Sequence, residues 1–166
     1  SYTSRTLRIV ADLLETGIQK EKILNLIYNN FSAERLRLQG YALNKRMVVL
    51  PELLSAYIFL TKDDLKEYSH VKGDTEGFVN MPLSIKGICF STLLIEKEGF
   101  IKLSFRSKGN FSVNDFAESY FSGGGHLNAA GGEYYDSLEN TLSYFLDVLK
   151  RDGGKILNSS KVDENN

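Results

Sequence analysis

Cysteine, histidine and long apolar runs are scarce in this sequence. Its 166 residues include one cysteine, Cys89, and two histidines. A single cysteine excludes an internal disulfide and is typical of a reducing compartment, so we expect a cytoplasmic location. No apolar run approaches the ~20 residues of a membrane span, and no basic-then-apolar signal segment opens the chain. We therefore expect a protein without a membrane partner.

Metal ligands are also too few for a built-in hydrolytic centre. Such a centre needs several His, Cys, Asp or Glu side chains that converge on the ion. His70 and His126 lie far apart in the sequence, there is no cysteine pair, and the 21 carboxylates are scattered. We expect no metal site in this chain, and no Ser/His/Asp relay can be assembled from the sequence.

The overall charge gives no general attraction to nucleic acid. The net charge is -1, with 42% hydrophobic and 25% charged residues, which is the range of globular proteins. Any anion-binding site must therefore be local. The chain opens at Ser1, directly on a helical pattern, which indicates a piece of a longer protein.

The periodicity of apolar residues changes along the chain. Up to about Asn44, apolar residues recur at helical spacing. From Arg46 onward, short strand-like runs alternate with helical patterns. The segments predicted as strands include 47–50, 54–60, 86–95 and 100–106. The fold class is therefore α/β, a single domain with a helical arm before it.

Capping residues mark several helix ends in this domain. Thr61 with Asp64 resembles a capping box, and Ser112 is a typical N-cap. Asp136 predicts the start of the final helix, and Gly153-Gly154 predicts its end. The polar residues from there to Asn166 are predicted to be disordered.

The segment FSGGGHLNAAGG, residues 121–132, places three glycines directly before a histidine. Consecutive glycines let backbone N–H groups approach an anion without obstruction by side chains. His126, just after them, can donate a hydrogen bond to a phosphate or stack on a base. The alternative is a tight turn between a helix and a strand, and the glycines alone do not decide between the two.

A local positive patch precedes this segment. Between residues 97 and 110 there are four basic residues and one acidic residue, Glu98. The basic residues are Lys97, Lys102, Arg106 and Lys108. Arginine is the side chain best suited to bidentate phosphate contact. A solvated strand edge would explain Lys97 and Lys108, but it explains Arg106 less well.

Together these motifs resemble the DHHA1 domain, the C-terminal domain of DHH-family phosphoesterases. The resemblance is to the branch of the bifunctional oligoribonuclease and 3′-phosphoadenosine-5′-phosphate phosphatase, and it covers residues 1–150. The matching stretches are Phe105-Arg106-Ser107-Lys108-Gly109, Gly123-Gly124-Gly125-His126, Asn128-Ala129-Ala130-Gly131, the segments 74–80 and 82–87, and Ser4-Arg5-Thr6.

This resemblance implies a central mixed sheet flanked by helices and a role in holding the nucleotide end of a substrate. It implies that Arg106 and Ser107 contact phosphate or base, that Gly123, Gly124 and Gly125 present backbone N–H groups, and that His126 contacts phosphate. Asp74, Glu76 and Asn80 also match, without an assigned contact.

The resemblance further implies that a separate N-terminal DHH domain binds catalytic Mn²⁺. This sequence has no Asp-His-His triplet, so no catalytic residue is assigned to it. The expected organisation is a helical linker over 1–45, the substrate-binding domain over 46–152 and the polar tail over 153–166. The expected ligand is a short oligonucleotide or a nucleotide phosphate.

Two other functions remain open. One is a non-catalytic RNA-binding module, like the DHHA1 domain of alanyl-tRNA synthetases, although a wider basic surface would be expected of it. The other is a structural or homodimerising fragment, in which the arm over residues 1–44 packs against a partner.

Overall fold

The computed structural model describes residues 3–160, which divide into two compact units at Ala33–Glu34. The first unit contains helix α1 (Ser4–Glu15) and helix α2 (Lys20–Tyr28). Gly17, with a φ of +83°, ends α1 as the sequence predicts.

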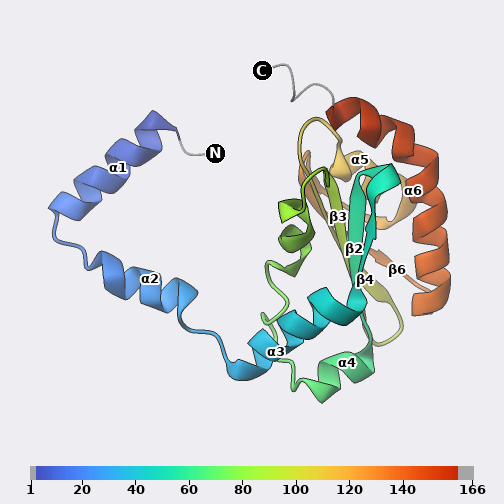
Figure 1. The fold of residues 1–166 in the computed structure, drawn as a ribbon, viewed down its shortest axis with the longest axis horizontal. Coiled ribbons are helices and arrows are strands. Elements are labelled where there is room, and N and C mark those ends of the chain that lie inside the picture. Colours follow the sequence, from blue (N-terminus) through green and yellow to red (C-terminus); the bar gives the residue numbers. More distant parts are fainter. Residues whose placement is uncertain (1–2, 161–166) are drawn as a thin grey trace. The chain divides into compact units, whose positions relative to one another are not determined.

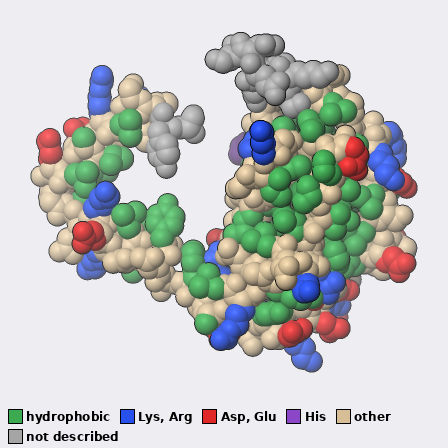
Figure 2. Space-filling view, in the orientation of Figure 1, with side chains coloured by type: hydrophobic (Ala, Val, Ile, Leu, Met, Phe, Trp, Pro, Cys, Tyr) green, Lys and Arg blue, Asp and Glu red, His purple; other side chains and the backbone are tan. Residues whose placement is uncertain are grey.

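Neither helix of the first unit buries any of its residues. Both are amphipathic, and Figure 2 shows their hydrophobic side chains on the surface. The exposed apolar residues of this unit are Leu7, Ile9, Val10, Leu13, Leu14, Ile18, Ile23, Leu24, Leu26, Ile27, Tyr28 and Phe31. A contiguous apolar surface of this kind is typical of a docking face.

The second unit is a six-stranded sheet with helices on both faces (Figure 1). Its strands are β1 (Met47–Leu50), β2 (Ser55–Leu60), β3 (Phe90–Glu96), β4 (Ile101–Ser107), β5 (Ser122–His126) and β6 (Ala129–Tyr134). Its helices are α3 (Ala33–Tyr41), α4 (Lys62–Glu67), α5 (Val113–Tyr120) and α6 (Leu138–Ser160), with short helical turns at Ala42–Arg46, Pro51–Leu53 and Phe78–Ser84.

The strands are arranged in the order β1-β2-β3-β4-β6-β5. β2 and β3 are parallel, whereas the other neighbours are antiparallel. The crossover between the parallel strands carries α4 and the 3₁₀ helix Phe78–Ser84. The predicted fold class, α/β with a central mixed sheet flanked by helices, is confirmed.

One face of the sheet packs against α5 and α6. Phe90, Leu103 and Phe105 from the strands meet Phe116 of α5 and Phe145 of α6, all of them nearly fully buried. Because β4 alternates buried and open positions, only one of its faces enters this core. The predicted half-buried strand over 100–106 is confirmed.

The apolar cover on the opposite face lies mainly over β2 and β3. Leu38 of α3 and Phe78 of the 3₁₀ helix bury Ile58, Leu93 and Ile95 there. Leu38 is fully buried and Ala42 belongs to the same cluster, so α3 is part of the domain. The expected linker over 1–45 is therefore too long, because the compact unit already begins at residue 34.

Helix α6 continues through Gly153-Gly154 to Ser160, so the predicted stop was wrong. Gly153 is buried, and a Cβ there would lie 3.0 Å from Leu53 Cδ2. Ile156 is fully buried in the core beyond it. This packing outweighs the low helix propensity of glycine. The expected tail over 153–166 is helical to residue 160, and its last six residues lie outside the described part.

Other helix ends differ less from the prediction. The capping boxes at Thr61–Asp64 and the N-cap at Ser112 are present. The final helix is capped by Ser137, whose hydroxyl accepts from the backbone N–H of Asn140, rather than by Asp136. Within residues 3–160, no helix combines the length and the apolar character needed to cross a bilayer.

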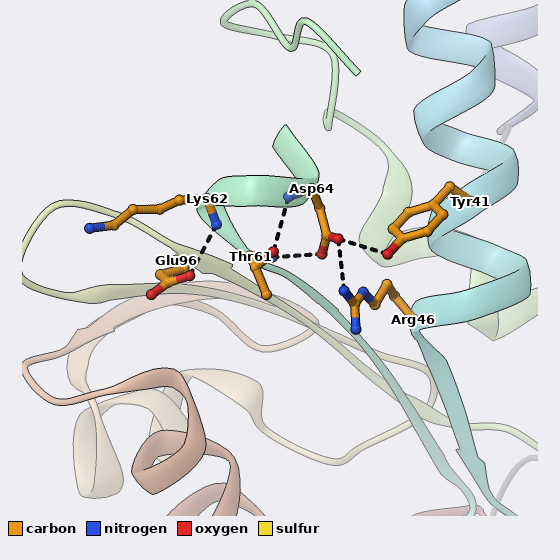
Figure 3. A network of polar contacts seen from close by, with 6 residues as sticks. All are labelled: Tyr41, Arg46, Thr61, Lys62, Asp64 and Glu96. Carbon is orange, nitrogen blue, oxygen red and sulfur yellow. Dashed lines mark hydrogen bonds and ion pairs between the residues drawn. The ribbon is translucent and has the colours of Figure 1, made fainter. Parts of the chain in front are cut away.

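A buried carboxylate connects α3, α4 and the start of β1 (Figure 3). Asp64 accepts hydrogen bonds from the hydroxyl of Tyr41 at 2.7 Å and from Nη2 of Arg46 at 2.8 Å. Its other oxygen accepts from the backbone N–H of Thr61 at 2.9 Å, which completes the capping box. This network fixes α3 and α4 relative to the sheet.

Candidate functional site

The half of the sheet formed by β4, β6 and β5 has one open face. Register partners share a face, so Lys102, Ser104 and Arg106 of β4 lie on the same side as Leu93 and Ile95. The apolar cluster on that side ends at β3. Lys102 is exposed, whereas Ser104 and Arg106 are half-buried. Polar side chains therefore line this part of the sheet.

Arg106 and His126 occupy one row across three strands. Arg106 pairs with Ala129 of β6, and Ala129 pairs with His126 of β5. Neighbouring strands lie about 4.8 Å apart, so the two Cα atoms are separated by about 10 Å. The small side chain of Ala129 lies between them in the row. The register thus places in one row the backbone positions of two residues that the sequence assigned to phosphate.

The glycines over 123–125 form an edge strand and not a tight turn between a helix and a strand. A Cβ on Gly123 would lie 2.0 Å from the carbonyl oxygen of Gly131, and a Cβ on Gly125 would lie 2.5 Å from that of Ala129. Both approaches are far inside van der Waals contact. The glycines are needed because β5 packs directly onto the backbone of β6.

Helix α5 holds this edge strand. The backbone N–H of Gly125 donates to Oδ1 of Asn114 at 2.7 Å, and the backbone N–H of Val113 donates to the carbonyl of Leu127 at 2.8 Å. One of the three glycine N–H groups assigned to the ligand is therefore already bonded within the protein. Gly123 and Gly124 instead line a shallow hollow on the open side.

We call this space the glycine hollow, with a volume of about 400 Å³. Its walls include Lys102 and Ser104 from β4 and Ser122, Gly123, Gly124, Gly131, Gly132 and Glu133 from β5 and β6. Because the glycines of β5 and β6 have no Cβ atoms, the backbone of these two strands forms the floor of the hollow. Such a surface admits a flat or bulky group close to the main chain.

Ser107 supports the site from behind. It is buried, and its hydroxyl donates to the carbonyl of Phe111 at 2.7 Å while it accepts from Nδ2 of Asn128 at 2.9 Å. The Asn128 amide also donates to the carbonyl of Gly109. The chain after β4 is thereby clamped to the start of β6. The Ser107 hydroxyl is used within the protein, so the structure does not place it where a ligand would meet it.

The loop over residues 74–77 forms the wall opposite Arg106. Thr75, Glu76 and Gly77 enclose, with Ser104, Lys102 and Arg106, a hollow of about 160 Å³, which we call the Arg106 hollow. Nη1 of Arg106 donates to the carbonyl of Phe105 at 2.8 Å, which holds the guanidinium near the sheet. The sequence matched residues 74–80 to the family without a role, and the structure places part of them at this wall.

Arg35 of α3 holds that loop. Its Nε donates to the carbonyl of Asp74 at 3.0 Å and its Nη2 to the carbonyl of Glu76 at 2.9 Å. Asp74 is itself buried, and its carboxylate accepts from the backbone N–H of Val71 at 2.8 Å. Asp74 therefore shapes the loop, whereas Asn80 is exposed. No signal in the sequence pointed to Arg35.

Replacement of Arg35 by glutamine is expected to loosen the loop. Hydrogen bonds from a charged donor are each worth about 1.5–3 kcal/mol, so amide exchange over residues 72–78 should accelerate by about tenfold or more. The matched control is Arg37→Gln on the same helix, where the side chain is 70% exposed and pairs with the neighbouring Glu34. Equal exchange in both variants would contradict the role of Arg35.

The remaining predicted side chains are dispersed. Nζ of Lys108 donates to the carbonyl of Leu83, so Lys108 serves a loop contact. His70 is half-buried beside Lys97, away from the row of Arg106. Among residues 3–160, no three His, Cys, Asp or Glu side chains lie close enough together to hold a metal ion.

The sequence has curated relatives that are longer than this chain. It is 28% identical over 133 residues to the bifunctional oligoribonuclease and PAP phosphatase NrnA of Bacillus subtilis, covering 80% of the chain and 41% of that protein. It is 28% identical over 129 residues to the protein of the same name from Thermus thermophilus, covering 78% of the chain and 37% of that protein. The chain thus spans about two fifths of these relatives.

The fold also matches solved structures. An exopolyphosphatase-related protein from Bacteroides fragilis is 44% identical, with a TM-score of 0.90 over 94% of the chain and 46% of that protein. A pGpG-specific phosphodiesterase from Vibrio is 12% identical with a TM-score of 0.56, which shows a shared fold. The sequence model of the DHHA1 domain matches residues 55–152. The chain belongs to the DHHA1 domain family.

Proposed function

We propose that the open half of the sheet binds the phosphate of a nucleotide or short oligonucleotide, as the substrate-binding part of a DHH-family phosphoesterase. The row that joins Arg106 to His126 carries this proposal. A guanidinium offers paired donors to phosphate oxygens, and an imidazole adds a further donor or stacks on a base. The backbone floor of the glycine hollow leaves room beside them for a nucleoside.

The proposal assigns the chemical step to another domain. A DHH domain would supply Mn²⁺ and the attacking water, because the described residues of this chain contain no metal-binding cluster. The exposed apolar face of α1 and α2 suits a docking surface for such a domain. The names of the curated relatives, an oligoribonuclease and phosphatase, support phosphate esters of nucleotides as the ligand class.

The binding test is an amide NMR titration of this chain with a 5′-phosphorylated dinucleotide, without metal. We expect shifts at Arg106, Gly123, Gly124 and His126, and no hydrolysis of the ligand. Arg106→Gln and His126→Gln should each weaken binding by about 10-fold or more, because each removes a donor to a charged group. Arg151→Gln, on α6 at the other face, is the control and should bind as the parent chain does.

Other outcomes would replace the proposal. Unchanged affinity in both Arg106→Gln and His126→Gln would remove the site. Tight, steeply salt-dependent binding of folded tRNA without binding of the dinucleotide would indicate the RNA-binding module instead. Hydrolysis of the dinucleotide by this chain in the presence of a chelator would show that it carries its own catalytic residues.

A further inference from the structure

A third hollow lies beyond Lys102, on the side away from the glycines. It has a volume of about 460 Å³, and we call it the lysine hollow. Its polar lining consists of His70, Lys72, Thr75, Glu76, Lys97 and Lys102. It adjoins the Arg106 hollow, with which it shares Lys102, Ile95 and the loop residues Thr75 and Glu76. Nothing in the site described above uses His70, Lys72 or Lys97.

The backbone around His70 and Lys97 is well fixed. His70 follows α4, and its backbone N–H donates to the carbonyl of Leu65 at 2.9 Å. Ser69 has a left-handed backbone, with a φ of +49°, and its N–H donates to the carbonyl of Lys66 at 3.1 Å. These two bonds form a Schellman motif. Lys97 begins the turn between β3 and β4, where its N–H donates to the carbonyl of Phe100. The hollow is therefore built on helix and strand ends.

The lining of this hollow carries more basic than acidic side chains. Over residues 3–160, the side chains of Lys72, Lys97 and Lys102 take part in no ion pair. Against these three ammonium groups the lining offers one carboxylate, Glu76. Burial, and then the charge of Lys97, lower the pKa of His70, whereas Asp74 acts in the opposite direction. The lining itself is therefore net positive, with Asp74 beside His70 and Glu133 opposite Lys102 as the neighbouring carboxylates.

The three hollows are arranged along one strand. Lys102 lines all of them: the lysine and Arg106 hollows adjoin on the side of β3 and the loop over 75–76, and the glycine hollow lies on the side of β6 and β5. Lys102 and Arg106 are four residues apart on β4, which corresponds to about 13 Å. Arg106 pairs with Ser91 of β3, and Lys97 follows six residues later, so the two Cα atoms lie about 20 Å apart along the sheet. A dinucleotide is short for this span. A strand of several nucleotides can cover it.

We propose that the lysine hollow binds a second backbone phosphate of a single-stranded oligonucleotide whose first phosphate lies at Arg106. This inference rests on the proposed function of the Arg106 row. It adds a separate anion site, formed by His70, Lys72 and Lys97, that a dinucleotide does not reach. Longer strands gain affinity there because each added phosphate contact releases counterions.

The two histidines of the chain provide a reporter in each site, since His126 belongs to the Arg106 row and His70 to the lysine hollow. Imidazole NMR signals, assigned with His70→Gln and His126→Gln, are followed during titration with 5′-phosphorylated di- and tetra-adenylate. The dinucleotide is expected to shift His126 alone. The tetranucleotide is expected to shift both signals and to bind about 10-fold more tightly.

The double variant Lys72→Gln/Lys97→Gln tests the hollow without touching Arg106. It should remove the His70 response and the advantage of the tetranucleotide, lower the salt slope by about 0.7 per lost phosphate contact, and leave dinucleotide affinity unchanged. Lys150→Gln on α6 is the matched charge control, and thermal unfolding checks that each variant is folded.

Two results would overturn the inference. If the tetranucleotide shifts His126 but not His70, and the double variant binds it as the parent does, the lysine hollow holds no phosphate while the function proposed for the Arg106 row stands. If neither ligand shifts either histidine at millimolar concentration, both the lysine hollow and the Arg106 row fail as phosphate sites in this chain.

Discussion

Replacement of Gly123 by alanine is expected to destabilise the domain by about 3 kcal/mol, the upper end of the usual cost of overpacking. The new methyl carbon would lie 2.0 Å from the Gly131 carbonyl oxygen and 2.5 Å from the Gly132 Cα. Both atoms belong to the backbone of β6, so no side-chain rotation relieves the contact. Edge strand β5 would have to separate from β6, and the pairing that carries His126 into the row would be lost.

The matched control is Gly124→Ala, one residue further along the same strand. There a Cβ would lie 3.4 Å from Asn114 Oδ1 and from Glu118 Oε1, which are side-chain ends at ordinary contact distance. Its unfolding free energy is expected to change by less than about 1 kcal/mol. Denaturant unfolding measures both variants, and for a chain of this size a 3 kcal/mol loss lowers Tm by about 6–12 °C.

The pair of variants separates two explanations of the glycine run. If close strand packing requires the glycines, Gly123→Ala loses stability and Gly124→Ala does not. If the glycines were selected only as a bare platform for a ligand, both variants would be equally stable and would differ in binding alone. Equal stability would therefore contradict the strand-packing explanation.

Local patterns in the sequence were sufficient for much of the fold. The alternation of Lys102, Ser104 and Arg106 with apolar residues predicted β4 and its polar face, because register and burial have a period of two. The capping box at Thr61 and Asp64 was predicted because both hydrogen bonds lie within one helical turn. Such signals depend on neighbours in the chain.

Features that depend on distant contacts were missed. Three glycines in a row favour a loop by local propensity, and only the approach of β6 makes them a strand. The glycine pair in α6 likewise predicts a helix end by local propensity. The helix continues because Gly153 packs against Leu53, which lies a hundred residues earlier in the sequence. In both cases tertiary packing outweighed the local preference.

In the candidate site, too, local motifs identified some residues, whereas contacts between distant segments could not be predicted. Arg106 and His126 were chosen from motifs, and the register of β4, β6 and β5 gives them a common row that the sequence did not reveal. The wall from residues 75–77 and its anchor Arg35 come from segments 29–71 residues away in sequence from Arg106. Burial of Ser107 could not be predicted from its place in the motif.

Asp64→Asn is expected to cost about 3 kcal/mol, because it removes the charge that balances Arg46 in a largely dry setting. The Asp64 side chain is 4% exposed and that of Arg46 is 27% exposed. The Arg46 guanidinium also lies over the rings of Tyr41 and Phe59, at 5.4 and 5.0 Å from their centroids. Without the Asp64 carboxylate, the Arg46 guanidinium would still lie against these aromatic rings but would have lost its counter-charge.

The loss should depend on pH in a defined direction. Burial alone would raise the pKa of Asp64, but the hydrogen bonds from Arg46, Thr61 and Tyr41 outweigh it and lower the pKa below its usual value. A carboxylate whose pKa falls on folding stabilises the protein above its unfolded pKa of about 3.9, and this stabilisation disappears as pH falls through the folded value. The difference between the parent chain and Asp64→Asn should therefore be largest above about pH 5 and should shrink steadily as pH falls below about 4.

Urea unfolding of the two chains across pH 3–7 tests this, with Asp63→Asn as the control. Asp63 is the adjacent carboxylate in the first turn of α4 and is exposed. Its removal should cost less than about 1 kcal/mol, the usual size of a helix-dipole interaction. If the difference between the parent and Asp64→Asn stayed constant down to pH 3, the carboxylate of Asp64 would not be the charged group that couples α3 and α4 to the sheet.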